Sequence, residues 1–590
     1  MPSLVYGKLA KRRHTIIVGP RGSGKTTLLK MLQQPAIEEW SHPESDTYRG
    51  KIDFTGVFVP TDLIWSEQLK SLGDGLDKQT VRLMGAAAFT THVLRGLTTS
   101  MIERTSNVVA AGRRSFRRVE VSRAAECDLA RFLSEAWHLK IGVPSFAAVY
   151  RGLGLRLSRI YEIASKEALL GRRGRAKRLA VVEFLQLHFL QSSAAAVDMF
   201  NEVVGERDGK WALAFDELEL APAWIQDELV KLLRSTDQRF IFKLAMSPYT
   251  NSVSQLRRSQ PPSANQDFDE IPLWYPNKRD AYSFCEELWH SMIAQRGYPA
   301  RGPQEVLGTS YFHSSSEELA RLGGAYAPGT ALYNAFQSLS DHDRSFRKYL
   351  ESKRINLAKT GELEESRRAA DIRKVASVVA LRGFYRGHGE DGASDVRGRS
   401  RKKSFFVGAE ALFAISEGNP RWFIGITESL LDRWRDQTKP IEESIQSEEI
   451  LKAAERYSAM LATIPIPAGR PVRNLLEILE SVGRFFHEQV VKGEFTAEPP
   501  GTFEVDKAVP IEVSQLLEPA VNAGAIVYVP ARKGEAFVVN MTGKRFRISY
   551  LLAPLYRIPL RLGKPANLSR ILILKRSDAD QLPLGYRDSE

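Results

Sequence analysis

The residues best suited to chemistry in this sequence form one glycine-rich run, GPRGSGKTT, at positions 19–27. Its glycines allow the backbone to curl until the amide groups point at phosphate oxygens. In such a loop Lys25 neutralises charge on the β- and γ-phosphates, and the Thr26 hydroxyl is a ligand of Mg²⁺. The candidates for contacting a nucleotide are Gly19, Pro20, Arg21, Gly22, Ser23, Gly24, Lys25, Thr26 and Thr27.

The elements on either side of this run are those that a P-loop requires. Thr15–Val18 reads TIIV, a β-branched apolar run typical of a buried strand, and it leads directly into the glycines. Thr27–Leu32 continues with the apolar spacing of a helix, whose N-terminus adds the positive end of its dipole to the phosphate site. The order strand, loop, helix therefore predicts a nucleotide-binding P-loop.

Two carboxylates, Asp216 and Glu217, follow the apolar run Trp211–Phe215, which reads as another strand. The carboxyl edge of a parallel sheet is where ligands bind. We expect Asp216 to hold magnesium together with Thr26, and Glu217 to polarise the attacking water. Taken alone, the pair could equally cap the helix predicted at Ile225–Leu233; the P-loop favours the catalytic interpretation.

A further strand is predicted at Phe240–Met246, and Ser247 follows it. Ser247 could contact the γ-phosphate or the water at the same edge of the sheet. A serine before a proline is also a common turn residue, so both interpretations stay open.

With these features the sequence resembles the AAA+ superfamily of P-loop ATPases, and more closely its origin-recognition and initiator-like branch, which is related to the STAND class. The run DFDEIPLWY at Asp267–Tyr275 stands where the family has its fifth strand, and Arg279–Ala294 begins the helices that it places in a lid. The resemblance implies ATP and Mg²⁺ as ligands and ATP hydrolysis as the activity.

The lid region contains the most specific part of the resemblance, EGNPRWFIGITESLLDRW at Glu417–Trp434. In this family a Gly-x-Pro-Arg at the start of a lid helix carries the sensor-2 arginine, so the resemblance assigns that role to Arg421. A guanidinium can bridge phosphate oxygens. The alternative is a first-turn arginine facing solvent after a proline at N1. The family's arginine finger, which acts on a neighbouring subunit, corresponds to Arg257 or Arg258 and would imply a homo-oligomer.

The predicted fold class is α/β, a three-layer P-loop AAA+ core with a long helical insertion, an α-helical lid and a C-terminal winged-helix-like α+β domain. The predicted boundaries are residues 1–275 for the core, with the insertion at about 70–208, then 276–435 for the lid, 436–503 for a helical linker and 504–590 for the last domain. Within the insertion, helices are expected at Val81–Ile102, Ala124–Trp137 and Leu179–Val203.

In the last domain we expect a helix at Val513–Ala523, a strand at Ala525–Val529, its partner at Ala536–Asn540 and a strand or helix at Lys544–Leu552. That order resembles the end of a winged helix with Arg532 and Lys533 at the tip of the wing, where cations contact phosphates. Winged helices also dock proteins, so this domain alone does not identify a partner.

Composition limits the class of protein. The 590 residues carry 83 Lys and Arg against 70 Asp and Glu, a formal charge of +13, which favours polyanions such as DNA. Two cysteines, Cys127 and Cys285, give neither a disulfide framework nor a zinc pattern. With neither a secretory signal nor a membrane span in the sequence, we expect a cytoplasmic protein. Basic clusters lie at 113–118, 172–178 and 397–403.

Two functions are compatible with these features. In the first, the chain is an ATP-driven AAA+ switch that acts on or with nucleic acid. In the second, it is a STAND-like signalling or antiviral-defence ATPase whose nucleotide state gates a protein partner encoded nearby. Loss of DNA affinity with rising salt would distinguish the first from the second.

Overall fold

The computed structural model describes most of the chain, in two compact units. The first unit comprises residues 1–19 and 24–273, and the second comprises residues 20–23 and 274–590. The turn Pro20–Ser23 of the glycine-rich run thus belongs to the second unit. The described residues are 3–61, 75–106, 115–234, 237–249, 267–274, 278–310, 331–357, 367–387, 405–464, 474–530, 537–538, 540 and 541–572.

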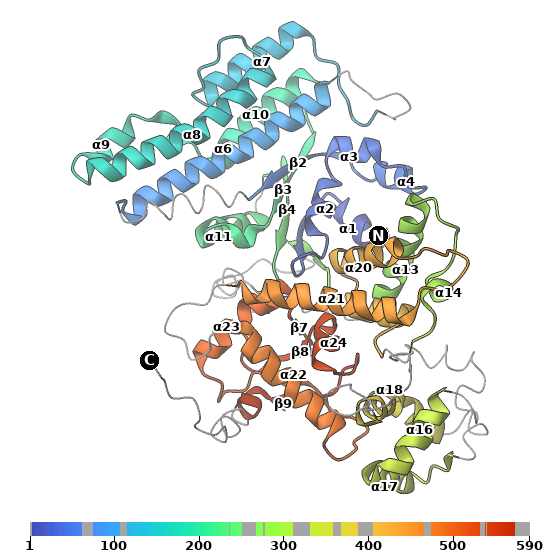
Figure 1. Ribbon diagram of the computed structural model, residues 1–590. Coiled ribbons are helices and arrows are strands. Elements are labelled where there is room, and N and C mark those ends of the chain that lie inside the picture. The colour runs from blue at the N-terminus through green and yellow to red at the C-terminus, as the bar shows by residue number, and fades with distance from the viewer. Residues whose placement is uncertain are drawn as a thin grey trace, which may run out of the picture. The chain divides into compact units, whose positions relative to one another are not determined.

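A sheet of five parallel strands forms the centre of the first unit (Figure 1). The strand order is β2-β3-β4-β1-β5, so the strand that precedes the glycine-rich run lies between β4 and β5. Apolar residues make up most of the inner strands β1, β3 and β4, because parallel strands are covered on both faces. The strands are β1 (His14–Val18), β2 (Phe54–Pro60), β3 (Lys210–Asp216), β4 (Phe240–Met246) and β5 (Phe268–Pro272).

Helices cover both faces of this sheet, and Figure 1 shows α2 and α11 on opposite sides of it. On the side of α2, residues such as Leu28, Leu29 and Ile37 pack with Ile17 and Ala245 of the strands in one buried cluster. The unit therefore has the three layers of an α/β P-loop core, as the sequence predicts. These helices are α1 (Ser3–Leu9), α2 (Lys25–Lys30), α3 (Gln34–Glu39), α4 (Ser45–Arg49) and α11 (Ala223–Lys231).

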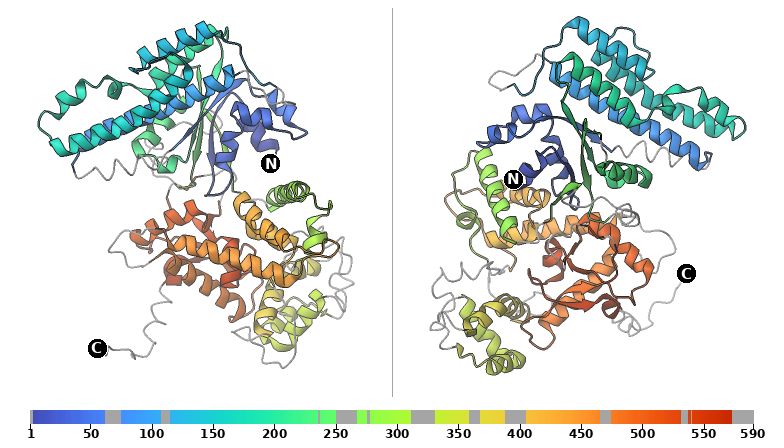
Figure 2. Two further views of the ribbon diagram at one scale, coloured as in Figure 1. Left: turned by 45° about the horizontal axis from the view of Figure 1, so that its top comes forward. Right: turned by 180° about the vertical axis from the view of Figure 1, so that it is seen from behind.

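A group of helices stands between β2 and β3 in the sequence, although these two strands pair directly, with Pro60 opposite Asp216. The rings of Phe89 and Phe189, from two of these helices, pack against each other, and Phe89 also stacks on Phe215 of β3. Figure 2 shows the group from two further directions. Its members are α6 (Lys78–Thr105), α7 (Arg123–Ala136), α8 (Phe146–Leu170), α9 (Arg175–Ala180) and α10 (Phe189–Val203).

Two details of this group differ from the sequence prediction. The helix α8 was not predicted; its buried positions, such as Leu153, Ile160 and Ala164, are separated by arginines and glycines that obscure the helical period. The segment 179–203 is not one helix, because α9 ends at Ala180 and a 3-10 turn at Glu183–Gln186 precedes α10.

The second unit is mainly helical in the part of the chain that the structure describes. The family-specific run that contains Arg421 lies on α20, which follows α19 closely. The helices are α13 (Lys278–Gln295), α14 (Pro303–Leu307), α16 (Ala331–His342), α17 (Arg344–Ser352), α18 (Arg367–Gly387), α19 (Ala409–Ser416), α20 (Pro420–Asp432), α21 (Glu443–Ala462), α22 (Leu475–Val491), α23 (Ile511–Ala523) and α24 (Ala553–Tyr556).

A second sheet of four strands, in the order β7-β8-β6-β9, lies in the second unit. Its strands are β6 (Pro500–Glu504), β7 (Ile526–Tyr528), β8 (Arg545–Ile548) and β9 (Lys564–Asn567). β7 pairs with β8. The predicted partner at Ala536–Asn540 lies partly outside the described residues and stays a prediction. The alternation of β8, with Phe546 and Ile548 buried, matches the buried face of β7. The winged-helix interpretation stays a prediction, and Arg532 and Lys533 lie outside the described residues.

None of the helices in the described ranges combines the length and apolar character that a membrane span needs.

Candidate nucleotide site

The glycine-rich run begins where β1 ends. The Gly19 amide donates to the Met246 carbonyl of the neighbouring strand (3.2 Å), which keeps the start of the loop at the carboxyl edge of the sheet. Gly24, at φ +91°, is in the left-handed region that favours glycine and caps the start of α2. Lys25 is buried, and its Nζ donates to the Gly19 carbonyl (2.7 Å). The ammonium group is thus folded back over the loop, where a phosphate would compete for it.

Asp216 lies at the same edge, two strands away from β1 in the order β3-β4-β1. Its backbone carbonyl accepts from Thr61 Oγ1 (2.7 Å), and its side chain is hydrogen-bonded to Thr26. Burial raises the pKa of the Asp216 carboxyl, while the Thr26 bond and the Lys25 charge act in the opposite direction. Among the described residues, none supplies a hydrogen bond to Asp216 Oδ1, although that oxygen is buried.

That arrangement fits a magnesium ion. A buried carboxylate oxygen without a partner costs about 1–3 kcal/mol, and a cation bound there would remove the cost. The adjacent Thr26 hydroxyl is a second oxygen ligand of the kind that Mg²⁺ takes. Within the described ranges, no group of three or more His, Cys, Asp or Glu side chains could hold a metal alone. Magnesium at Asp216 and Thr26 would therefore need phosphate oxygens and water as further ligands.

Glu217 follows Asp216 in an uncommon backbone conformation. Its φ of +50° lies in the left-handed region, which costs a residue with a side chain about 1–3 kcal/mol, and its side chain is exposed. This turn directs successive carboxylates differently, because Asp216 is buried and Glu217 is accessible. Such strain is concentrated at functional sites. The separate roles of the two residues stay a prediction.

Ser247 is buried directly after β4. Val18 pairs with Met246, so Ser247 and the first residue of the glycine-rich run leave neighbouring strands at the same level. The structure thus brings Gly19, Lys25, Thr26, Asp216 and Ser247 to one edge of one sheet. Glu217 leaves the sheet at that edge, and Thr27 lies exposed on α2.

Arg421 lies in the first turn of α20 in the second unit, with Pro420 at the start of that helix. The Asn419 side chain caps α20, because its Oδ1 accepts from the Arg421 amide (3.1 Å), and its Nδ2 donates to the Arg21 carbonyl (3.1 Å). The Arg421 side chain is exposed and lies beside Gly22, where an added Cβ would meet its Cβ at 3.0 Å. Sequence reasoning missed Asn419, although an asparagine before Pro-Arg is a recognisable N-cap.

Glu417 is a second residue that sequence reasoning did not select. It ends α19 with a φ of +55°, and its carboxylate pairs with Arg547 of β8. The same carboxylate accepts from Ser549 Oγ (3.2 Å) and from the Tyr550 amide (2.8 Å). One residue thus links the start of the run Glu417–Trp434 to the four-stranded sheet of the same unit. No local sequence signal identifies a partner that is 130 residues away.

The candidate fingers, Arg257 and Arg258, lie outside the described residues. Two polar ring side chains near the N-terminus, Tyr6 and His14, serve the core. The Tyr6 hydroxyl donates to the Met31 carbonyl (2.7 Å), and His14 Nδ1 accepts from the Phe242 amide (3.0 Å).

The basic cluster at 113–118 is partly neutralised within the chain. Arg117 donates to Glu206 Oε2 (3.0 Å), and Glu206 also binds the fully buried Arg104 (2.6 Å). Arg118 forms a two-point contact with Glu38 of α3, at 2.8 and 2.6 Å. These bonds attach the end of α6 to the core. Arg117 and Arg118 thus have structural roles within the chain, which reduces the charge that this cluster offers to a polyanion.

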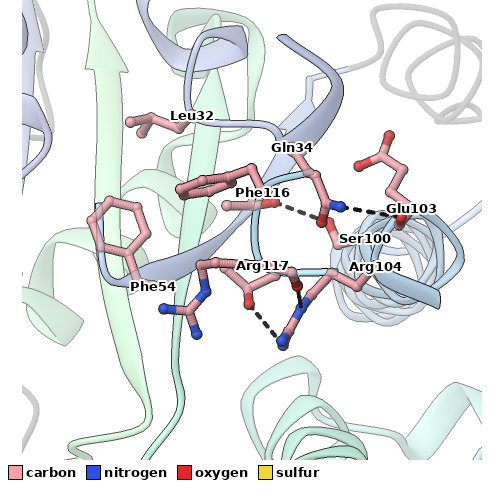
Figure 3. Close-up of a pocket in the computed structure, with 10 residues that line it drawn as sticks. Leu32, Gln34, Phe54, Ser100, Glu103, Arg104, Phe116 and Arg117 are labelled. Carbon is pink, nitrogen blue, oxygen red and sulfur yellow. Dashed lines mark hydrogen bonds between the residues drawn. The ribbon is translucent and has the colours of Figure 1, made fainter. Parts of the chain in front are cut away.

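Figure 3 shows the small cavity beside these bonds. Its volume of about 10 Å³ has room for about one water, so it is no ligand site. Gln34 Nε2 donates to the Glu103 carbonyl (3.4 Å), and Ser100 Oγ donates to the Gly56 carbonyl (3.0 Å). Burial and the nearby Glu38 raise the pKa of Glu103 to about 7. These contacts join α6 to α3 and β2.

Two arginines of the cluster at 172–178 are also used internally. Arg175 is buried and donates to Asp77 Oδ2 (2.8 Å) and to the Glu167 carbonyl (2.8 Å). Arg178 holds both Glu167 carboxylate oxygens, at 2.8 and 2.6 Å. These bonds fasten the C-terminal part of α8 to α9 and to the start of α6. The cluster at 397–403 lies outside the described residues.

Comparison with known proteins gives one match. A family model described as ORC-CDC6-like covers residues 1–568 of the chain. No curated protein and no solved structure matches the chain.

Proposed function

Because the chain belongs to the ORC-CDC6-like family of AAA+ ATPases related to initiators, we propose that it binds ATP with Mg²⁺ and hydrolyses the γ-phosphate. The observation that carries the proposal is the buried Asp216 Oδ1, which has no hydrogen-bond partner among the described residues and lies on a side chain that Thr26 holds. A structural carboxylate at this depth would be expected to have all its acceptors filled.

The roles of the residues follow from their positions. Lys25 is released from the Gly19 carbonyl and neutralises phosphate charge. Thr26 and Asp216 hold magnesium, which when bound supplies charge stabilisation to the phosphates. Glu217, exposed on its strained turn, orients and polarises the attacking water. For Ser247 and Arg421 we propose contact with the γ-phosphate, and for Arg257 or Arg258 action on a neighbouring subunit.

The activity is tested by three variants of the full chain. Glu217→Gln should keep ATP binding and reduce turnover by about 100-fold or more, because the amide no longer accepts a proton. Lys25→Ala should abolish nucleotide binding. Asp208→Asn, an exposed carboxylate in the turn before β3, is the matched control and should leave both unchanged. Equal turnover in Glu217→Gln and the control would remove Glu217 from its role.

We further propose that the switch acts on or with nucleic acid. The support is the net charge of +13 and the family's relation to initiators. The ion pairs of Arg117, Arg118, Arg175 and Arg178 reduce the contribution of the helical insertion to such a surface.

A filter-binding titration against salt, with ATP present, tests this partner. Phosphate contacts release counterions, so DNA affinity should fall steeply as salt rises. Absence of binding at low salt would contradict the nucleic-acid proposal and favour the alternative, a STAND-like ATPase that gates a protein partner.

A further inference from the structure

A basic pocket of about 660 Å³ lies in the second unit, away from the glycine-rich run in sequence. Its walls come from three elements, the end of α18, the second half of α22 and the residue that ends α24. A volume of this size is in the range of about 300–1,000 Å³ that small-molecule sites occupy. The lining residues are Tyr385, Arg386, Arg484, His487, Glu488, Val491, Lys492 and Arg557.

Positive charge dominates the lining. Arg386, Arg484, Lys492 and Arg557 carry four positive charges, and Glu488 carries the only negative charge among the described lining residues. A concave surface with one sign of charge concentrates the field at its centre and attracts ligands of the opposite sign. The lining therefore favours an anion with several charges.

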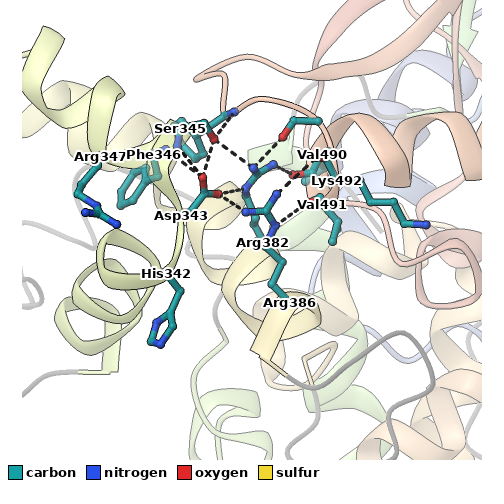
Figure 4. A network of polar contacts seen from close by, with 12 residues as sticks. His342, Asp343, Ser345, Phe346, Arg347, Arg382, Arg386, Val490, Val491 and Lys492 are labelled. Carbon is teal, nitrogen blue, oxygen red and sulfur yellow. Dashed lines mark hydrogen bonds and ion pairs between the residues drawn. The ribbon is translucent and has the colours of Figure 1, made fainter.

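The polar network behind the pocket leaves this excess unchanged, because it adds one positive charge, Arg382, and one negative charge, Asp343 (Figure 4). Asp343 Oδ2 is shared by two guanidinium groups, at 2.6 Å from Arg382 Nε and 2.7 Å from Arg386 Nη1. The Val490 and Val491 carbonyls at the end of α22 accept further bonds from these two arginines, each at 2.7 Å. One carboxylate and the carbonyls of a helix end thus face two full positive charges.

Helix capping explains Arg382 and Arg386 without any ligand, because arginines at a helix C-terminus satisfy its last carbonyls. It does not explain Arg484, which lies exposed on α22 two turns before that end. It does not explain Arg557 either, which belongs to another element. These two residues carry the argument for a site.

Arg557 is held in place at a cost. Its φ of +53° lies in the left-handed region, where glycine would be free of strain. Gly483 permits this position, because an added Cβ would meet Tyr556 Cγ at 2.4 Å and push α24 away from α22. His487 Nδ1 donates to the Arg557 carbonyl (3.1 Å), and the guanidinium lies over the Tyr385 ring, 5.5 Å from its centre. The chain thus keeps an arginine, not a glycine, where the backbone favours glycine.

We propose that this pocket binds a small organic polyphosphate at a site separate from the P-loop. Cations from three elements surround the pocket, so a ligand with several phosphate groups could contact all of them, whereas one phosphate could reach only some. Guanidinium groups bind phosphate oxygens at two points, which adds geometry to the charge attraction. The inference does not depend on ATP hydrolysis at Lys25 and Asp216.

The test uses the full chain with Lys25→Ala, which removes phosphate binding at the P-loop, and inorganic tripolyphosphate as the probe. Calorimetric titration at low salt should show one tripolyphosphate bound per chain. Arg484→Glu should weaken the affinity by at least about tenfold. Arg557→Gly should do the same while keeping the fold, because glycine relieves the backbone strain. Arg456→Glu, an exposed arginine on α21, is the matched control and should bind as the parent does.

Competition with a single-stranded oligonucleotide distinguishes the source of the phosphates. Tripolyphosphate binding that Arg484→Glu and Arg557→Gly both weaken, with the control unchanged, supports the proposal. Equal affinity in all variants would overturn it. Weakening of oligonucleotide binding alone, without a tripolyphosphate site, would also overturn it and make the pocket part of a nucleic-acid surface.

Discussion

Replacing Asp343 by alanine should loosen the contact between α17, α18 and the end of α22 more than any exposed substitution nearby. The Asp343 carboxylate is 3% exposed and receives five hydrogen bonds. Two come from the amides at the start of α17, one from the Ser345 hydroxyl and two from Arg382 and Arg386. The residue therefore caps a helix and compensates a guanidinium that is 1% exposed.

The cost can be worked out in two steps. The surrounding donors lower the pKa of Asp343 from 3.8 to about 2, and about 1.4 kcal/mol per pKa unit gives about 2 kcal/mol for the charge. This stability is present above the unfolded pKa and is lost as pH falls towards 2. Asp343→Asn keeps one acceptor oxygen for the cap and removes the charge beside Arg382 and Arg386, so it should cost about 2 kcal/mol. Asp343→Ala also removes the cap, which raises the cost to about 3–5 kcal/mol, although the Val490 and Gly493 carbonyls still accept from Arg382.

Hydrogen exchange of peptides from α17 and α18 measures this locally, since a chain of several domains does not unfold in one step. At neutral pH, protection should fall about 30-fold in Asp343→Asn and at least about 100-fold in Asp343→Ala. Asp341→Ala, an exposed position on α16, is the control. Protection in Asp343→Ala equal to that in the control would refute the reasoning.

Two further predictions concern the first unit. Burial and Lys243 lower the pKa of His14 to about 4, so the unfolded chain takes up the proton first as the pH falls. The free energy of unfolding should therefore fall between pH 6.5 and 4, by up to about 3 kcal/mol. His14→Asn keeps an acceptor for the Phe242 amide and should flatten this slope in melting curves; an unchanged slope would exclude His14 as its source. Glu206→Gln leaves the buried Arg104 without its carboxylate and should lower hydrogen-exchange protection at the end of α6. The control Glu202→Gln, at an exposed position on α10, should not lower it. Equal protection in the two variants would show that the ion pair does not anchor the helix.

The core of the first unit was predictable because its signals are local. Each parallel strand is a short apolar run, and β1 and β4 were placed within one residue of their ends. The helix α8 and the pairing of β7 with β8 were not predictable, for different reasons. In α8 polar residues interrupt the apolar period, and in β8 four alternating residues are too few to distinguish a strand from the helix that was also considered.

The sequence also predicted which residues meet at one edge of the sheet, namely Gly19, Lys25, Thr26 and Asp216. The P-loop motif identifies the loop residues, and the end of an apolar strand identifies the carboxylate. The unpartnered Asp216 Oδ1 and the strained turn at Glu217 were not predictable, because both depend on what the rest of the fold places around them. The bonds of Asn419 and Glu417 join partners that are 398 and 130 residues away in the sequence, and no local sequence signal identifies such pairs.

The surroundings of the charged side chains are the feature that the sequence predicts least. Clusters of arginines look alike in a sequence whether they face solvent or a carboxylate, and Arg117, Arg118, Arg175 and Arg178 proved to face carboxylates. The pocket at Arg484 and Arg557 shows the opposite case: its cations form no cluster in the sequence. They are spread over 172 positions, from Arg386 to Arg557, and the fold brings them together. A positive surface is therefore better sought where cations from separate elements converge and outnumber the carboxylates than where they are consecutive, since consecutive residues on a helix face different directions.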